Sequence, residues 1–409
     1  MDEKQSKEQK SLPWIRKRHR IFRRLAAPFV ALWMKLTGVT VEPFPEGSKR
    51  PHLILFNHQT PYDQFFPAIS FHAPVYFVAT EDIFSMGFLS SLLRFLVAPI
   101  PIRKMTMDFT TLRTIMQVKE EGGTIAIAPE GNRTYSGKTE YINPAIAQLA
   151  KALKLPIALY RIEGGYGFWP RWSAKTRKGK VRAYVSRLIE PEEVSAMTSE
   201  TLFAEIRNEL NVNEAVADTK FVSDRKAEYI ESAAYVCPFC GLSVFRSSGN
   251  EAECLTCHRK ITYHEDKQIT GIGFDFPFRF FNDWYEYQKA FVNRLDLLSL
   301  KNVCLFTDTA DISEVIVYKK KLLLFPKSEI SLYGERIVLN EGSSEALSLP
   351  FEEITAAAVL GHNKLNVYHG EKIYQFKGDQ RFNALKYVNL YYRYKNLTTR
   401  KNNGEFWGL

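Results

Sequence analysis

Two side chains, those of His58 and Asp63, have the types and the spacing of a general base and the carboxylate that orients it. They follow an apolar run, residues 53–56, that predicts a buried strand. Thr60 and Pro61 are typical of an N-cap and a first helical position, so we expect a helix from Pro61 with Asp63 in its first turn. A histidine held by a carboxylate at a strand end favours proton-transfer chemistry. The alternative is that Asp63 only caps the helix and complements its dipole.

A second segment, residues 124–137 (TIAIAPEGNRTYSG), favours the chemical interpretation. A short apolar strand ends there in Glu130 and Gly131, and Arg133 follows in a loop rich in Ser and Thr. The planar guanidinium of an arginine can donate two parallel hydrogen bonds to a phosphate. The pattern therefore predicts a base at one strand end and an anion-binding arginine at another.

The two segments resemble a known family. NHQTPYD, at residues 57–63, resembles the N-H-x-x-x-x-D block of the glycerolipid acyltransferases, typified by 1-acylglycerol-3-phosphate acyltransferase. APEGNRTYSG is similar to the (F/V)-P-E-G-x-R-S block of that family. Further matches are FVATEDIF at 77–84, PIPIRK at 99–104 and LPIALY at 155–160, so the resemblance covers roughly residues 14–210.

The resemblance implies a role for each matching residue. His58 would be the general base and Asp63 would fix its tautomer. The acceptor site would include three residues of the second block: Glu130, Gly131 and Arg133. Arg103, further upstream, is a second candidate for binding the acceptor phosphate. The chain departs from the family at Thr80, where a basic residue is usual, and at Met86-Gly87, where a proline is usual. These departures leave the identity of the acceptor open.

The implied activity is a membrane-associated O-acyltransferase in phospholipid biosynthesis. It would move a fatty acyl group from acyl-CoA or acyl carrier protein to a lysophospholipid such as 1-acylglycerol-3-phosphate. The alternatives are a different lipid acceptor, or a non-enzymatic membrane adaptor built on the same fold. No redox or nucleotide cofactor is expected, because the sequence has no G-x-x-x-x-G-K-[ST] motif and the glycines at 164–167 lack dinucleotide spacing.

Four cysteines form two C-x-x-C pairs, Cys237 with Cys240 and Cys254 with Cys257. Two such pairs predict a structural zinc site that resembles a zinc ribbon. The sequence C-x-x-C-H also matches haem attachment, but the partner pair and the absence of an export signal favour zinc over haem or disulfides. The fifth cysteine, Cys304, is expected to be a small buried hydrophobic residue.

The charge of the chain argues against nucleic acid as a partner. Residues 235–270 carry four Lys or Arg and four Asp or Glu, so the zinc-binding segment offers no basic stripe. The net charge of +10 is instead concentrated in residues 1–36, where ten basic and three acidic residues give 10 − 3 = +7. An anionic membrane surface is therefore the expected partner.

In residues 1–36, aromatic and other apolar residues recur largely at helical spacing, and most of the charged residues between them are basic. This pattern predicts an amphipathic helix in a membrane interface. Its longest apolar run, residues 25–34, is about half of the roughly 20 residues that a membrane span needs. We therefore expect peripheral or monotopic attachment at the cytoplasmic face; the alternative is a core-packing helix with a solvated basic face. A second apolar segment, residues 84–97, predicts either a buried helix or the wall of an acyl-chain groove.

Short strands alternate with helices up to residue 210, which predicts an α/β fold in which helices cover the acyltransferase sheet. The expected organisation is an interface segment at 1–36, an acyltransferase domain at 37–210, a connector and zinc ribbon at 211–270, an aromatic-rich helical connector at 271–310, and a last domain at 311–400. The last domain has strands at regular spacing and one closing helix, an order similar to the β-barrel of pleckstrin-homology (PH) and GRAM-like domains.

Overall fold

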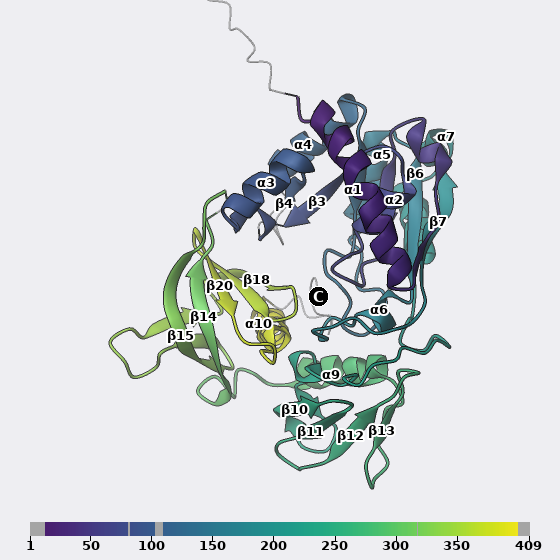
Figure 1. Cartoon of the computed structure of the whole chain (residues 1–409). Helices are drawn as coiled ribbons and strands as arrows, with labels where there is room; N and C mark the ends of the chain where they lie inside the picture. The colour runs from purple at the N-terminus through teal and green to yellow at the C-terminus, as the bar shows by residue number, and fades with distance from the viewer. Residues whose placement is uncertain (1–12, 81, 103–108, 317, 400–409) are drawn as a thin grey trace, which may run out of the picture.

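The computed structural model describes residues 13–80, 82–102, 109–316 and 318–399. Three parts are visible in Figure 1: a helix-covered sheet at the top, a small ribbon-like part at the bottom, and an antiparallel sheet with a helix at the left. Arg103 and the basic residues before residue 13 lie outside the described residues.

The described part of the first region contains a seven-stranded sheet in the order β1-β7-β6-β2-β5-β3-β4. Neighbouring strands run parallel, except for the antiparallel pair β6–β7. The strands are β1 (Val39–Val41), β2 (Leu53–Phe56), β3 (Val75–Thr80), β4 (Ile100–Ile102), β5 (Thr124–Ile127), β6 (Ile157–Glu163) and β7 (Val181–Ile189). The predicted α/β class is confirmed. Because β2 and β5 are parallel neighbours, the residues that follow these two strands meet at one edge of the sheet.

The central strand β2 is buried on both faces, as expected between two helical layers. Leu53 and Leu55 face a core shared with α4 (Phe109–Glu120), α5 (Ala145–Leu153) and α8 (Ser199–Leu210). Ile54 and Phe56 face the opposite core, beneath α1 (Lys17–Leu36) and α2 (Phe65–Ser70). Shorter helices connect these layers: η1 (Pro45–Ser48), η2 (Ile83–Ser85), α6 (Gly165–Phe168) and α7 (Pro191–Ala196).

Two helices leave apolar side chains in solvent. On α1, one stripe with three- or four-residue spacing is exposed: Ile21, Leu25, Phe29, Leu32 and Leu36. On α3 (Phe88–Leu96), Phe88 is 83% exposed and Leu89, Leu92 and Phe95 are exposed beside it. The prediction of a buried helix at 84–97 is therefore wrong for α3. No helix of the described residues combines the length and the apolar character that a membrane span requires.

The second part begins with η3 (Ile230–Ser232) and contains small sheets of short strands. These are β8 (Val236–Cys237), β9 (Gly241–Leu242), β10 (Phe245–Ser248), β11 (Glu251–Cys254), β12 (Lys260–Tyr263) and β13 (Ile269–Gly271). The predicted helix in the aromatic connector is α9 (Phe281–Arg294). It lies against this part, because the Trp284 indole donates to the Val236 carbonyl at 2.8 Å and the Gln288 side chain accepts from Tyr235 N at 2.8 Å.

The described residues of the last part form a seven-stranded antiparallel sheet in the order β17-β16-β15-β14-β20-β19-β18, closed by α10 (Ala384–Thr399). The strands are β14 (Cys304–Glu314), β15 (Leu322–Tyr333), β16 (Arg336–Leu339), β17 (Leu347–Pro350), β18 (Ile354–Leu360), β19 (Lys364–His369) and β20 (Lys372–Lys377). This sheet begins at Cys304, seven residues before the expected boundary at 311.

Cys304 is exposed, so the prediction of a buried thiol is wrong. A register shift separates Cys304 from Phe306 in the pairing of β14 with β15. Such an irregularity changes the direction of the side chains on either side of it. Phe306 is therefore buried in the core, whereas Cys304 is exposed.

The three parts are packed against one another. One continuous apolar core joins the ribbon, α9 and the last sheet, and it also contains Tyr135, Tyr166 and Trp172 from the first part. Trp172 makes ring contacts with Tyr263 and Phe281. The segment between α6 and β7 is therefore supported by aromatic residues that follow it in the chain, and Tyr135 of the loop after β5 stacks on Tyr285 of α9 in the same core.

Candidate active site

The loop after β2 is fixed by Asn57, which is buried at the end of the strand. Its side-chain amide donates to the Ile162 carbonyl at 2.9 Å, and its oxygen accepts from Ile162 N at 2.7 Å. These paired hydrogen bonds tie the end of β2 to β6. They give the first residue of the N-H-x-x-x-x-D block a positioning role, which the sequence analysis had not assigned.

His58 and Asp63 are in contact at this edge of the sheet. The Nδ1 atom of His58 lies 2.8 Å from Oδ2 of Asp63. The Asp63 carboxylate is fully buried and also accepts hydrogen bonds from Gln59 N at 2.5 Å and from the Thr60 hydroxyl at 2.6 Å. The carboxylate is therefore held in place by its own loop, and it can orient the imidazole.

The expected helix from Pro61 is replaced by a turn, and α2 starts only at Phe65. The Asp63 carboxylate accepts hydrogen bonds from the backbone N–H groups of Gln59 and Thr60 and from the Thr60 hydroxyl, and these contacts hold residues 59–63 in a compact loop. The interpretation of Asp63 as a helix cap alone is thus wrong, because its acceptor atoms are used by the loop and by His58.

Burial lowers the pKa of His58 below its ordinary value, and the hydrogen bond to Asp63 opposes this shift only in part. The positive charges of Arg133 and Arg171 lower the pKa of His58 further. The imidazole is therefore neutral near pH 7. With Nδ1 directed at Asp63, its Nε2 atom is available to accept a proton.

Glu130 connects the two sequence blocks. Its Oε1 accepts from His58 N at 2.8 Å, and its Oε2 accepts from Glu140 N at 2.8 Å. In return, Thr134 N donates to the His58 carbonyl at 3.0 Å. Burial raises the pKa of Glu130 well above its ordinary value. Both of its carboxylate oxygens are used by backbone N–H groups, so Glu130 positions the loops on which His58 and Arg133 lie.

Gly131 and Arg133 follow Glu130 in the loop after β5. Gly131 has φ +66°, a conformation in which any other residue would be strained. The pKa of Arg133 is lowered to about 10 by burial and by the nearby Arg171, so its guanidinium remains charged near pH 7. Across the described residues, no carboxylate lies within ion-pair distance of this guanidinium. The site thus presents an uncompensated cation close to His58.

Arg171 is a further candidate residue of the site, which the sequence motifs do not indicate. Its side chain is buried, and it donates to the Arg133 carbonyl at 2.6 Å and to the Gly361 carbonyl at 2.8 Å. Its guanidinium also lies over the ring of Tyr135, 4.2 Å from the centroid. Arg171 therefore joins the loop after β5 to the turn between β18 and β19 in the last part of the chain. Arg171 lies outside the motifs that resemble the acyltransferase family, so no sequence signal singles it out.

The last part of the chain also contacts the segment after β3. Asp82 accepts hydrogen bonds from Lys364 at 2.9 Å and from Gln375 at 3.1 Å, and it pairs with Lys321. Burial alone would raise the pKa of Asp82, but the two lysines outweigh it and lower the pKa to about 2. The same burial lowers the pKa of Lys321, so the ion pair also carries a desolvation cost. Arg103, the second predicted phosphate ligand, lies outside the described residues.

The four predicted metal ligands lie together. The Sγ atoms of Cys237, Cys240, Cys254 and Cys257 are all within 4.8 Å of one another. The separations Cys237–Cys257 and Cys240–Cys254 are 3.8 and 3.6 Å. Sulfur atoms at about 2.3 Å from a tetrahedral zinc ion would be about 3.8 Å apart. The cluster therefore fits a metal ion such as zinc.

Comparisons with known proteins bear on the first part of the chain. Residues 36–161 match the family model described as Acyltransferase. This segment contains His58, Asp63, Glu130 and Arg133, which the structure brings together. A comparison with curated proteins gives no match.

Two solved structures are similar to parts of the chain. One is the crystal structure of the 1-acyl-sn-glycerophosphate (LPA) acyltransferase PlsC from Thermotoga maritima, with a TM-score of 0.38 and 21% identity over 47% of this chain and 75% of that chain. The other is a Vps36 N-terminal PH domain, with a TM-score of 0.19 and 15% identity over 23% of this chain and 80% of that chain.

Proposed function

We propose that the protein is an acyltransferase that moves a fatty acyl group from a thioester to a hydroxyl of a lysophospholipid, of the 1-acylglycerol-3-phosphate type, at a membrane surface. The observation that carries the proposal is the contact between His58 Nδ1 and Asp63 Oδ2 at 2.8 Å, with Arg133 beside it. The match of residues 36–161 to the acyltransferase family supports the reaction class.

In this reaction His58 Nε2 removes the proton of the acceptor hydroxyl, and Asp63 stabilises the imidazolium that forms. The hydroxyl oxygen attacks the thioester carbonyl carbon, and a C–O bond forms. As the tetrahedral intermediate collapses, the C–S bond breaks and the proton on Nε2 passes to the leaving thiolate. The products are an ester and a free thiol of coenzyme A or acyl carrier protein, and no covalent enzyme intermediate is required.

The acceptor phosphate would be bound by Arg133, with Gly131 allowing the loop to approach it closely. Glu130 would hold this loop against the His58 loop. Arg103 remains the proposed second phosphate ligand. An arginine suits this role because its fork can donate two hydrogen bonds to one phosphate.

Attachment to an anionic membrane would occur through α1 and α3, whose apolar side chains are exposed, together with the basic residues of the N-terminal segment. We propose a peripheral or monotopic location on the cytoplasmic face. A structural zinc ion bound by the four cysteines would stabilise the second part of the chain. The last part is proposed to be a PH/GRAM-like domain.

The test is acyl transfer by the purified full-length chain. Acyl-CoA and acyl carrier protein are offered as donors with a panel of lysophospholipids, and transfer to at least one phosphate-bearing acceptor is expected. His58→Ala should lower kcat about 100- to 10,000-fold, whereas His72→Ala, which removes an exposed histidine, should leave it unchanged. Arg133→Lys should raise KM for the acceptor more than for the donor, because a point charge lacks the bidentate fork. A loss of less than about tenfold in His58→Ala would contradict the mechanism.

A further inference from the structure

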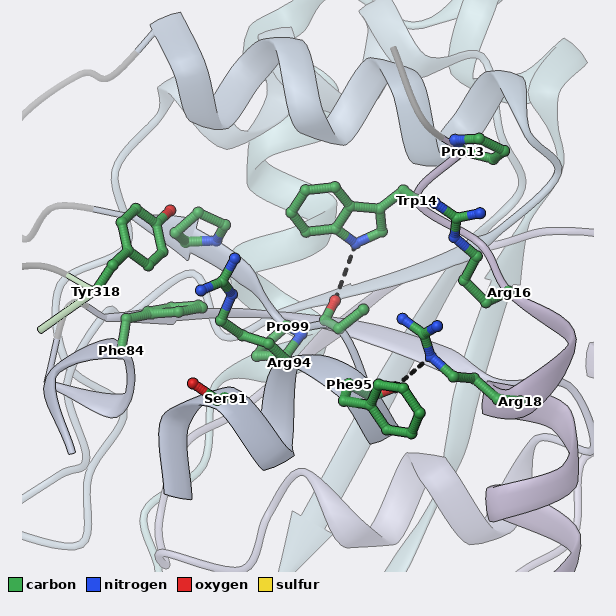
Figure 2. A pocket seen from close by; sticks show the side chains of 12 residues that line it. Pro13, Trp14, Arg16, Arg18, Phe84, Ser91, Arg94, Phe95, Pro99 and Tyr318 are labelled. Carbon is green, nitrogen blue, oxygen red and sulfur yellow. Dashed lines mark hydrogen bonds between the residues drawn. The ribbon is translucent and has the colours of Figure 1, made fainter. Parts of the chain in front are cut away.

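A cavity of about 550 Å³ lies between the N-terminal segment, α3 and the last part of the chain. Figure 2 shows Trp14 and Arg16 at one end of it and Phe84 and Tyr318 at the other. Trp14 is fixed there, because its indole N–H donates to the Ala98 carbonyl at 3.0 Å. None of the candidate catalytic residues lines this cavity.

Three guanidinium groups line the cavity, those of Arg16, Arg18 and Arg94. Within the described ranges, none of them forms an ion pair. The nearby Glu121 carboxylate accepts instead from the backbone N–H groups of Trp14 and Ile15. Among the described residues the three guanidinium groups therefore have no ion-pair partner, although Arg16 is near enough to Glu121 to help lower the pKa of that carboxyl.

Two of these cations are held in place by uncharged groups. Arg18 donates to the Phe95 carbonyl at 2.7 Å and lies over the Phe95 ring, 4.1 Å from its centroid. Arg94 lies over the ring of Tyr318, 4.7 Å from its centroid. A guanidinium that stacks on a ring uses its face and keeps N–H groups at its edge for an acceptor. Free N–H groups of this kind suit a phosphate.

The surroundings of the cavity indicate where this phosphate comes from. Arg18 lies on the same face of α1 as the exposed apolar stripe, because Ile21 and Leu25 follow it by three and seven residues. Phe95 belongs to the exposed apolar side of α3. On the last part of the chain, Leu322 and Leu323, which follow Tyr318 by four and five residues, are exposed. Apolar side chains from three elements thus surround a cationic cavity, as expected where a protein meets the head groups and the acyl chains of a bilayer.

We propose that this cavity binds the phosphate of an anionic phospholipid of the membrane, and that α1, α3 and the hairpin between β14 and β15 contact the bilayer together. Arg16, Arg18 and Arg94 bind the head group, and the exposed stripes enter the acyl-chain region. The site is distinct from the acceptor site at His58. The proposal rests on the membrane attachment proposed above, but it does not depend on acyl transfer.

The test compares vesicles of equal charge with and without an anionic phosphate. The full-length protein is titrated with phosphatidylcholine vesicles that contain either phosphatidylglycerol or the amount of oleate that gives the same surface charge. The wild type should prefer phosphatidylglycerol, and Arg18→Gln/Arg94→Gln should lose that preference, with binding to these vesicles weakened about tenfold or more, the factor expected from one charge-assisted hydrogen bond. Tyr318→Ala should weaken the preference, while Tyr318→Phe, which keeps the ring, should retain it.

The matched control is Arg20→Gln/Arg24→Gln, which removes the same charge from exposed positions of α1 that do not line the cavity. It should weaken binding to both kinds of vesicle equally and keep the preference. His58→Ala should bind as the wild type does, so a failure of acyl transfer can be told apart from a failure of this site. An equal loss in the two double variants, or displacement of the vesicles by free coenzyme A, would overturn the proposal. Unchanged thermal unfolding of the variants excludes misfolding as the cause.

Discussion

The side chain of Arg171 holds the backbone of Arg133, because the Nη1 atom of Arg171 donates to the Arg133 carbonyl oxygen at 2.6 Å. Because the same guanidinium donates to Gly361, the loop that presents Arg133 is connected to the last part of the chain. His362, next to Gly361, is close enough for Arg133 to lower its pKa, although burial is the larger cause. The last part of the chain is therefore a structural neighbour of the candidate acceptor site.

The first prediction concerns this connection. Arg171→Met removes the donors but keeps an apolar stem, so the Arg133 loop should lose its support. We expect KM for the acceptor to rise and kcat/KM to fall about tenfold to a hundredfold, the range for loss of one or two hydrogen bonds from a charged donor. Steady-state kinetics with each substrate varied in turn would measure this.

A matched control is available in Arg177, which is equally buried and donates to the Lys226 carbonyl without contacting Arg133. Arg177→Met should lower the stability but leave KM for the acceptor unchanged. If the two variants lose activity in parallel, Arg171 has only a general structural role.

The second prediction concerns the pH dependence of the reaction. The pKa of His58 is lowered by burial, so its neutral form persists below pH 6.5 and kcat should fall only at more acidic pH. His58→Ala should lower kcat about 100- to 10,000-fold. Asp63→Asn removes the charge that raises the pKa of His58, so it should move the acidic limb to still lower pH and reduce the plateau. A plateau that begins only above pH 7 would show that another group titrates.

The third prediction concerns Asp82, which holds the last part of the chain to the segment after β3. Its pKa is about 2, below the ordinary value near 3.8. A depressed folded-state pKa gives stability that is present above the ordinary value and is lost as the pH falls towards 2. Asp82→Asn leaves Lys321 and Lys364 facing each other without a counter-charge, and should lower the free energy of unfolding by about 2 kcal/mol at neutral pH.

Denaturant unfolding at neutral pH and near pH 2 would measure this effect. The difference between wild type and Asp82→Asn should shrink at the acidic pH, because about half of the wild-type carboxylate is protonated near its pKa of about 2. The control is Glu46→Gln, which removes an exposed ion pair with Lys49 and should leave the unfolding curve unchanged. A difference that is independent of pH would point to packing rather than charge.

Much of the site could be predicted from the sequence because its chemistry is local. His58 and Asp63 are five residues apart, and the buried strands that precede His58 and Glu130 show as apolar runs. The parallel pairing of β2 with β5 then brings the two blocks to one edge of the sheet. The four cysteines could be predicted for the same reason, since each C-x-x-C pair is a local unit.

Contacts between distant segments could not be predicted in this way. Arg171 meets Gly361 across 190 residues, and Asp82 meets Lys364 across 282 residues. No periodicity or motif in one segment specifies its partner in another. The exposure of α3 could not be predicted from the sequence either. An apolar helix at 84–97 has the same residue pattern whether it packs in a core or faces a membrane. The turn at Pro61 was also not predicted, because the helix signals at Thr60 and Pro61 do not reveal that Asp63 holds the loop before α2 through the N–H groups of Gln59 and Thr60.

The last prediction concerns the metal. Purified protein should contain close to one zinc ion per chain, and Cys237→Ser should lose it, whereas Cys304→Ser, which alters an exposed thiol outside the cluster, should keep it. The effect should reach the active site, because α9 is held to the strand that carries Cys237 through Trp284, and Tyr285 of α9 stacks on Tyr135 with 6.4 Å between the ring centroids. Loss of zinc should therefore raise KM for the acceptor as well as destabilise the ribbon. Metal analysis together with kinetics would test both effects, and a zinc-free variant with unchanged kinetics would confine the metal to a local structural role.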